Sequence, residues 1–356
     1  MINSIEMVDV LKVVVPAVLT FFIAISITPF FTSQFYKYKM WKKNPRTEAN
    51  ITTDDFTKIH NTASELSTPR IGGVIIWVSV ILCVFIIYLL SLIFPNDLMQ
   101  KLNFFSRSQT LIPLAALIFA SLVGLADDLL QIMGKGSYAQ DPLIYRKIKI
   151  GMICLIGLLI SFWFYDKLQA TAIHIPFDGE LELGLLFIPF FITVMLGVFS
   201  ASVIDGIDGL SGGVMAIIFI AYSVIAFVHN QIDIAALCAV IAGGTLAFLW
   251  FNVPPARFYM GETGMLGLTV ALSVIAFLTN SSLLLLVIAF PLVITSLSVV
   301  IQINVYKYFN KRRVFKVAPL HHHFEAMGWS REKIVMRYWI LSVIFAIIGV
   351  IIALIS

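Results

Sequence analysis

Long apolar stretches recur along the chain and constrain its fold more than any other feature. The hydrocarbon core of a bilayer is about 30 Å thick, so a helix needs roughly 20 apolar residues to cross it. The strands of a membrane barrel would alternate apolar with polar residues instead. We therefore expect an all-α polytopic membrane protein with about ten transmembrane helices, at about 10–36, 72–95, 108–130, 147–165, 184–204, 212–229, 233–252, 264–280, 282–307 and 334–355.

The composition excludes most classes of soluble protein. Of the 356 residues, 60% are hydrophobic and 12% are charged, against roughly 45–50% and about 25% in soluble domains. A soluble fold could not hide so much apolar surface, because its exterior must be wetted. Soluble enzymes and nucleic-acid-binding domains are therefore disfavoured, and the expected surroundings are a lipid bilayer. No segment between spans exceeds about 35 residues, which favours one integral membrane domain over residues 1–356.

Basic residues are distributed unequally between the two sides of the expected bundle. Of the 24 Lys and Arg residues, 20 lie in alternate loops or at their flanking helix ends. These loops are 37–71, 131–149, 205–211, 253–263 and 308–333. Basic residues concentrate in cytoplasmic loops of membrane proteins. We therefore expect these loops in the cytoplasm and both termini outside.

One outer loop carries a hairpin pattern. Residues 174–183 alternate around Asp178 and Gly179, and an Asp-Gly pair favours a tight turn between two strands. The pattern predicts a small β-hairpin that caps the outer face.

Ionisable residues that could carry chemistry gather at helix ends on the expected cytoplasmic side. Each alone could be a solvated cap or a polar loop residue, but ionisable groups beside apolar spans are costly and usually functional. They come from four separate loops: Asp127, Asp128, Asp205, Asp208, Glu262, His321, His322 and His323.

Two of these clusters have informative spacing. Asp205 and Asp208 are three residues apart, so one helical turn would put both carboxylates on one face. Gly206 between them permits close approach of the backbone to a ligand. In the His321–His323 triplet, at most two adjacent imidazoles would share a ligand.

Taken together, the clusters indicate a site for a divalent metal and phosphate. Carboxylate oxygens suit Mg²⁺, which binds through one or two carboxylates plus substrate phosphates. Basic side chains that would neutralise phosphate oxygens lie in the same loops: Lys58, Arg70, Lys147, Arg257 and Lys316. Such a site would bring together two anionic substrates that otherwise repel each other.

At these motifs the chain resembles the polyprenyl-phosphate N-acetylhexosamine-1-phosphate transferases. The resemblance covers nearly the whole chain. Its most specific part runs from Lys316 to Glu325 (Lys-Val-Ala-Pro-Leu-His-His-His-Phe-Glu), and Gly328-Trp329 and Arg337–Ile340 follow. This loop is most similar to the branch of the family that uses UDP-N-acetylmuramoyl-pentapeptide.

The resemblance implies a reaction, a cofactor and a location. Phospho-N-acetylmuramoyl-pentapeptide would pass from UDP to undecaprenyl phosphate, giving lipid I and UMP for peptidoglycan synthesis. The cofactor would be Mg²⁺. The protein would be a homodimer in the cytoplasmic (inner) membrane, with its active site on the cytoplasmic face.

The resemblance also implies roles for the catalytic carboxylates. Asp205 would hold Mg²⁺. Asp127 would accept the proton of the lipid phosphate or hold that phosphate in line, and Asp128 would support it. Because a phosphomonoester has a second pKa near 6, the lipid phosphate is largely ionised and Asp127 could act by position alone.

Other residues would bind the substrates. The resemblance assigns the nucleotide to Gly206, Asp208, Asn252 and Tyr259, with the Tyr259 ring stacked on uracil; an interfacial aromatic is the alternative for Tyr259. Glu262 would serve the same ion or partner as the family's usual aspartate. Around the diphosphate or sugar would lie Gln302, His321, His322 and His323. Lys147 and Lys58 are further phosphate candidates, although both also fit the positive-inside pattern alone.

Three parts of the sequence depart from the family pattern. Pro69–Gly73 is closer to the branch that transfers N-acetylglucosamine phosphate. Phe199 and Ser202 stand where asparagines are usual before Asp205. Glu262 replaces an aspartate, which lengthens the arm by one methylene.

These departures leave alternatives open. The first is transfer of N-acetylglucosamine-1-phosphate to a polyprenyl phosphate for another surface polymer. A second is a transporter or flippase, although transporter sites usually lie near the membrane midplane. A third is a family member that binds lipid phosphate without catalysis.

Overall fold

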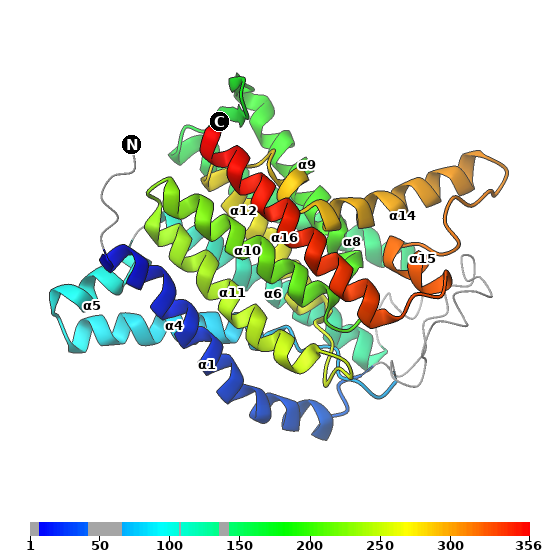
Figure 1. Cartoon of the computed structure of the whole chain (residues 1–356), viewed down its shortest axis with the longest axis horizontal. Coiled ribbons are helices and arrows are strands. Elements are labelled where there is room, and N and C mark those ends of the chain that lie inside the picture. Colours follow the sequence, from blue (N-terminus) through cyan, green and yellow to red (C-terminus); the bar gives the residue numbers. More distant parts are fainter. Residues whose placement is uncertain (1–6, 42–65, 107, 135–141) are drawn as a thin grey trace.

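A computed structural model describes residues 7–41, 66–106, 108–134 and 142–356 (Figure 1). Within these ranges ten helices are long and apolar enough to cross a membrane, which confirms the ten expected spans. Nine of them correspond to α1 (Met7–Lys37), α4 (Val74–Ile93), α6 (Ser108–Met133), α8 (Pro142–Lys167), α10 (Leu210–Val228), α11 (Ile232–Asn252), α12 (Gly261–Leu278), α14 (Phe290–Tyr308) and α16 (Arg331–Ile355). The fifth span, Gly184–Ile204, consists of α9 (Phe187–Ser200) and the short 3-10 turns at its two ends.

Short elements connect these helices. A helix satisfies its own backbone hydrogen bonds, so the apolar stretches stay helical and the connections collect at their ends. The connecting elements are α5 (Asp97–Leu102), η1 (Phe104–Ser106), β1 (Ala172–Ile175), β2 (Gly179–Glu182), η2 (Gly184–Leu186), η3 (Ala201–Ile204), α13 (Leu285–Ile288) and α15 (Leu320–Ala326).

The ninth span is not the continuous helix expected over 282–307. It is divided at Ala289 into the single turn α13 and the longer α14. Pro291 lies in the first turn of α14, where its missing N–H costs no helical hydrogen bond. In Figure 1, α14 extends away from the rest of the bundle, beside α15.

Helix α12 lies at the centre of the bundle and is the most buried of the ten, whereas α1 is the most exposed. Small residues let α6 approach α12 closely. A Cβ atom on Gly124 of α6 would clash with the backbone of Glu262, and one on Gly267 of α12 would clash with Ser121. Such small-residue contacts are typical of membrane helices. They bring the C-terminal end of α6 against the start of α12.

The β-hairpin predicted over 174–183 is confirmed. Strands β1 and β2 pair antiparallel, with Ile175 opposite Gly179. The hairpin lies beside the C-terminal end of α16, because His174, Asn280 and Ser356 line one cavity of about 260 Å³. Helix α1 also begins at this end of the bundle (Figure 1). The two ends of the described chain therefore lie at the same end of the bundle.

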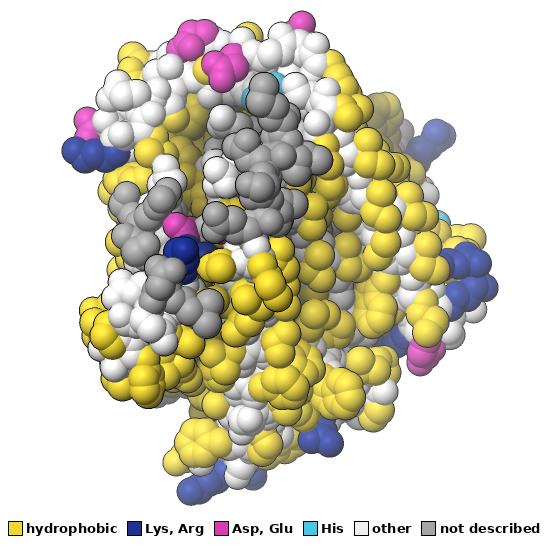
Figure 2. All heavy atoms as spheres, turned by 60° about the vertical axis from the view of Figure 1, so that its left-hand side comes forward, with side chains coloured by type: hydrophobic (Ala, Val, Ile, Leu, Met, Phe, Trp, Pro, Cys, Tyr) yellow, Lys and Arg dark blue, Asp and Glu magenta, His cyan; other side chains and the backbone are white. Residues whose placement is uncertain are grey.

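Hydrophobic side chains dominate the outside of the bundle. Figure 2 shows a face largely covered by them, with few charged groups. On α16, for example, Met336, Ile340 and Ile347 are exposed. Such a surface is stable against acyl chains rather than water.

A candidate active site at the helix ends

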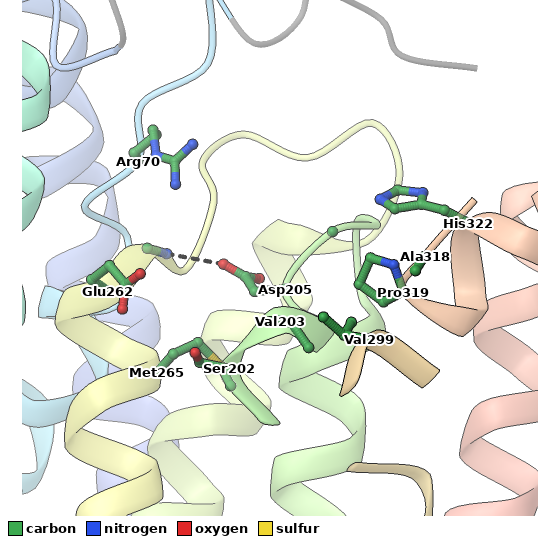
Figure 3. A pocket seen from close by; sticks show the side chains of 12 residues that line it. Arg70, Ser202, Val203, Asp205, Glu262, Met265, Val299, Ala318, Pro319 and His322 are labelled. Atoms are coloured by element: carbon green, nitrogen blue, oxygen red, sulfur yellow. Dashed lines mark hydrogen bonds between the residues drawn. The ribbon is translucent and has the colours of Figure 1, made fainter. Parts of the chain in front are cut away.

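A cavity of about 250 Å³ opens at the end of the bundle opposite the hairpin. Arg70 and Glu262 stand on one side of it, Asp205 lies between, and His322 faces them from the other side (Figure 3). These residues come from the segment before α4, the start of α12, the turn before α10, and α15. Four loops that are distant in the sequence thus meet around one space.

Asp205 is held in the cavity by two hydrogen bonds. The hydroxyl of Ser211 donates to Oδ1 at 2.7 Å, and the backbone N–H of Gly261 donates to Oδ2 at 3.3 Å (Figure 3). Burial raises the pKa of the Asp205 carboxyl, although Ser211 and the Arg70 guanidinium oppose that rise. The carboxylate is therefore fixed in position and close to a cation.

The turn that follows Asp205 places Gly206 against two imidazoles. A Cβ atom on Gly206 would lie 2.5 Å from Nε2 of His321 and 2.9 Å from Nε2 of His322. Only glycine fits there. The two imidazole rings also contact each other, with centroids 4.3 Å apart. The third histidine, His323, instead accepts a hydrogen bond at Nδ1 from the backbone N–H of Lys316. Two of the three histidines thus face the Asp205 turn.

His321 is fully buried, and neither ring nitrogen has a hydrogen-bond partner among the described residues. Burial, with a smaller contribution from His322, lowers the pKa of His321 well below 6.5. The ring is therefore neutral at physiological pH, and its Nε2 lies against Gly206 rather than in the cavity lining.

His322 is oriented by a carboxylate outside the cavity. Its Nδ1 lies 2.9 Å from Oε2 of Glu325, whose other oxygen pairs with Arg331. Burial by itself would raise the pKa of Glu325, but the contacts with His322 and Arg331 hold that pKa below its usual value. An imidazole fixed at Nδ1 presents Nε2 to the cavity.

Asp127 lies behind Glu262 and does not line the cavity. The ammonium group of Lys149 lies 2.8 Å from Oδ2 of Asp127 and 2.7 Å from Oε1 of Glu262. Lys149 comes from α8, so this bridge joins the ends of α6, α8 and α12. Asp127 is therefore linked to the cavity through Lys149 and Glu262.

Asp128 is fully buried and caps the start of α12. Its Oδ2 accepts a hydrogen bond from the backbone N–H of Thr263 at 2.9 Å, as a carboxylate does at a helix N-terminus. Gly261 has a positive φ of 70°, and a Cβ atom there would clash with the Arg70 carbonyl. This glycine lets Asp128, Arg70 and Asp205 approach the same helix end.

The expectation that one helical turn puts Asp205 and Asp208 on one face is wrong. The segment between η3 and α10 is a turn that ends at Gly209, with φ of 79°. Because the turn reverses the chain, Asp208 points away and accepts a hydrogen bond from the backbone N–H of Ala256 at 3.1 Å. Burial raises the pKa of Asp208, although the hydrogen bond from Ala256 and the positive charge of Arg331 oppose that rise.

Two candidate amides hold loops in place. Asn252 accepts a hydrogen bond from Gly209 N–H and donates one to the Phe258 carbonyl, both at 2.9 Å. Gln302 accepts from the backbone N–H groups of Val314 and Phe315. Neither lines the cavity. Their structural role is to position the loops that border it.

Two further candidates, Tyr259 and Lys147, lie outside the cavity lining. Tyr259 is half-buried, and its backbone pairs with Pro69 and Gly72. Lys147 is exposed on α8. Lys58 lies outside the described residues. A nucleotide or phosphate role for these three stays a prediction.

Lys149 takes a position that the sequence did not single out for the site, whereas Arg70 was expected among its basic residues. Residues two apart on a helix point to nearly opposite sides, so Lys149 faces inward where Lys147 faces out. One signal was present: Lys149 falls inside an apolar span, where a charge needs a partner. Arg70 had only its place among other basic loop residues.

The donor set suits a cation that takes few protein ligands. Among the described residues no group of three or more His, Cys, Asp or Glu side chains could hold a metal. Asp205 and Glu262 nevertheless share the cavity, and Oε2 of Glu262 and Oδ1 of Asp128 are buried without a hydrogen-bond partner among those residues. Mg²⁺ commonly binds one or two carboxylates and completes its shell with water and phosphate. These residues fit that pattern.

The chain is similar to known transferases over most of its length. A family model for glycosyl transferase family 4 matches residues 110–280. A phospho-N-acetylmuramoyl-pentapeptide-transferase of Anoxybacillus flavithermus is 35% identical over 285 residues, which is 80% of this chain and 83% of the relative. A phospho-N-acetylmuramoyl-pentapeptide-transferase of Clostridium perfringens is 34% identical over 340 residues, which is 95% of this chain and 98% of the relative. Another, from Borrelia turicatae, is 32% identical over 352 residues, which is 93% of this chain and 92% of the relative.

Proposed function

Because the chain belongs to the phospho-N-acetylmuramoyl-pentapeptide-transferase family, we infer that it transfers phospho-N-acetylmuramoyl-pentapeptide in peptidoglycan synthesis. We propose that the donor is the UDP-linked sugar and the acceptor is undecaprenyl phosphate, so that the products are lipid I and UMP. The observation that carries this proposal is the convergence of Asp205, Glu262, Arg70 and His322 on one cavity. Carboxylates, a guanidinium and imidazoles are the groups that a reaction between two phosphates requires.

The proposed step exchanges one phosphoanhydride bond for another. An oxygen of the lipid phosphate attacks the β-phosphorus of the UDP-sugar. The bond from that phosphorus to the bridging oxygen breaks, and the electron pair leaves with UMP. Alignment and charge neutralisation dominate such transfers.

The residues of the cavity supply both effects. Arg70, beside Asp205 and Glu262, places a fixed positive charge where phosphate oxygens collect. His322, oriented by Glu325, offers Nε2 to the diphosphate or sugar. Lys149 holds Asp127 and Glu262 in a rigid arrangement, so Asp127 contributes by position. A general base is not needed for an acceptor phosphate that is already ionised.

Mg²⁺ is the cofactor that we propose for this site, held by Asp205 with Glu262 near it. When bound, it would supply charge neutralisation and Lewis acidity at the diphosphate.

We propose that the cavity faces the cytoplasm and that both termini lie outside, in the cytoplasmic (inner) membrane. The loops around the cavity hold most of the basic residues, and basic loops stay in the cytoplasm. The UDP-sugar would reach the site from that side. A homodimer remains part of the proposal because the sequence resemblance implies it.

The relatives above bear the muramoyl name, which favours that substrate over N-acetylglucosamine phosphate. The test is an assay of the purified full-length protein with undecaprenyl phosphate, Mg²⁺ and each UDP-sugar in turn. We expect UMP and a lipid-linked muramoyl-pentapeptide only with the matching donor and only when the lipid phosphate is present. UMP with UDP-N-acetylglucosamine alone as donor would favour the alternative transferase. No UMP with either would contradict the proposal and leave a lipid-phosphate-binding protein or a transporter.

A further inference from the structure

A second cavity lies between α15 and α16, apart from the candidate active site. Its volume is about 310 Å³, and no residue lines both cavities. Its lining is almost entirely apolar, with a single charged member: Phe324, Trp329, Ile334, Arg337, Tyr338, Ile340 and Leu341. Nothing in the proposed transfer reaction uses it.

The indole of Trp329 anchors the mouth of this cavity. It stacks on the Phe324 ring with centroids 4.7 Å apart and planes within 14°. The Arg337 guanidinium lies 4.2 Å from the indole centroid, and the Lys333 ammonium lies 4.9 Å from it. Cation–π contacts of this kind hold basic groups in place at modest cost. Two cations are thereby positioned at one edge of an apolar cavity.

Neither cation is neutralised by a carboxylate of the described chain. Arg331, on the same stretch of helix, pairs with Glu325. For Lys333 and Arg337 no ion pair occurs among the described residues, and both side chains are exposed. They are four residues apart, so they lie on one side of α16. An anionic group could bind to both at once.

The candidate membrane span of α16 begins at Arg331, so Lys333 and Arg337 occupy its first two turns. Basic side chains near the end of a span reach the level of the lipid headgroups. Ile340 and Leu341 continue the cavity lining onto the exposed apolar surface of the helix. A hydrocarbon chain could therefore enter sideways from the bilayer while its headgroup stays at the level of the two cations.

We propose that this cavity binds an anionic glycerophospholipid, with its phosphate on Lys333 and Arg337 and part of one acyl chain against Trp329 and Leu341. Ligand pockets measure roughly 300–1,000 Å³, so about 310 Å³ accepts a segment of one chain but not a headgroup as well. Basic pockets beside membrane helices recognise anionic headgroups by this chemistry. Charge complementarity selects an anionic lipid over a zwitterionic one.

Native mass spectrometry of the full-length protein, released from neutral detergent, tests the proposal. Phosphatidylglycerol and phosphatidylcholine with the same acyl chains are titrated separately into the wild type and three variants. The double variant Lys333→Gln/Arg337→Gln removes the cations, and Leu341→Trp fills the cavity. Lys311→Gln/Arg312→Gln is the matched control, because it removes two exposed cations from the loop after α14.

We expect the wild type to bind phosphatidylglycerol more tightly than phosphatidylcholine. The cation variant should lose about fivefold in affinity per removed charge, the scale for basic residues near an anionic membrane surface. Leu341→Trp should weaken binding of both lipids, and the control should match the wild type. Each variant is first compared with the wild type in thermal unfolding, and the two single substitutions replace the double one if it does not fold.

Three results would overturn the proposal. The first is equal affinity of the wild type for the two phospholipids. The second is an unchanged phosphatidylglycerol affinity in the cation variant. The third is competition from undecaprenyl phosphate that displaces phosphatidylglycerol at an equimolar amount, because the cavity would then be a second site for the lipid phosphate substrate.

Discussion

The Lys149 ammonium lies 2.7 Å from a carboxylate oxygen of Glu262, and this contact joins α8 to the first turn of α12. The Lys149 ammonium also pairs with the carboxylate of Asp127, which lies near the C-terminal end of α6. The three charged groups are largely withdrawn from solvent. A buried pair of this kind contributes little net stability, but the loss of one partner is costly.

We expect Lys149→Met to lower both stability and turnover. Without the ammonium group, two carboxylates stay close together in a poorly solvated place, and breaking a buried pair costs about 3–5 kcal/mol. Thermal unfolding in detergent should shift down and UMP release should fall. Lys147→Met, on the exposed side of the same helix, is the stability control. Equal unfolding temperatures for the two variants would show that the ion pairs of Lys149 do not contribute to the stability of the fold.

At position 262 we expect Asp to work and Ala to fail. Glu262→Asp shortens the arm by one methylene, roughly 1.5 Å, but keeps a carboxylate beside Lys149 and the cavity. UMP release should stay within about tenfold of the wild type, because the charge remains in place. Glu262→Ala removes it and should reduce turnover much further. If Glu262→Ala turns over normally, this residue only supports the fold.

Asp205→Asn should lower turnover by about 10²–10³ and leave the fold intact. The amide can still accept the Ser211 hydrogen bond, but it carries no charge for a metal ion. Loss of one preorganised electrostatic group commonly costs about 10²–10³ in rate. UMP release under saturating substrates measures the effect. Asp178→Asn, in the hairpin at the other end of the bundle, should behave as the wild type, and near-normal turnover in Asp205→Asn would remove that residue from the mechanism.

Acidification should destabilise the protein through His321. Its pKa in the folded state is lowered well below 6.5, first by burial and then by His322. The unfolded chain therefore takes up a proton that the folded chain does not. Stability is fully present above pH about 6.5 and is lost as pH falls toward the lower folded pKa, at up to about 1.4 kcal/mol per pH unit.

His321→Gln removes this titration and isolates it. Its unfolding temperature should fall less than that of the wild type between about pH 6.5 and pH 5. The range stops above the usual pKa of 4.5 for Glu325, whose pKa is also lowered. Parallel pH profiles for the two proteins would show that His321 does not carry the effect.

Removal of divalent cations should stop the reaction. Asp205 and Glu262 share the cavity with Arg70, and the two phosphate-bearing substrates add further negative charge that the Arg70 cation alone would not neutralise. With a chelator in excess, UMP release should fall to background, and Mg²⁺ should restore it. Turnover that persists in chelator would contradict the magnesium proposal but would leave the transferase assignment unchanged.

The local sequence alone determined the helices and the helix ends at which the candidate acids and histidines lie. A stretch of about 20 apolar residues in a bilayer has one way to satisfy its backbone, so the ten spans were predictable one at a time. The hairpin at Asp178 and Gly179 follows from turn chemistry in the same way. The candidate acids and histidines were visible because charges are scarce in this chain.

Tertiary packing decided which of those side chains meet. Lys149 rather than Lys147 faces the carboxylates because the register of α8 against α6 and α12 turns it inward. Asp205 enters the cavity and Asp208 leaves it because a turn ending at Gly209 replaces the helix that their spacing would allow. Both outcomes depend on backbone direction and on neighbours far away in the chain. Local sequence therefore sets which groups are present at the membrane surface, and packing sets their geometry.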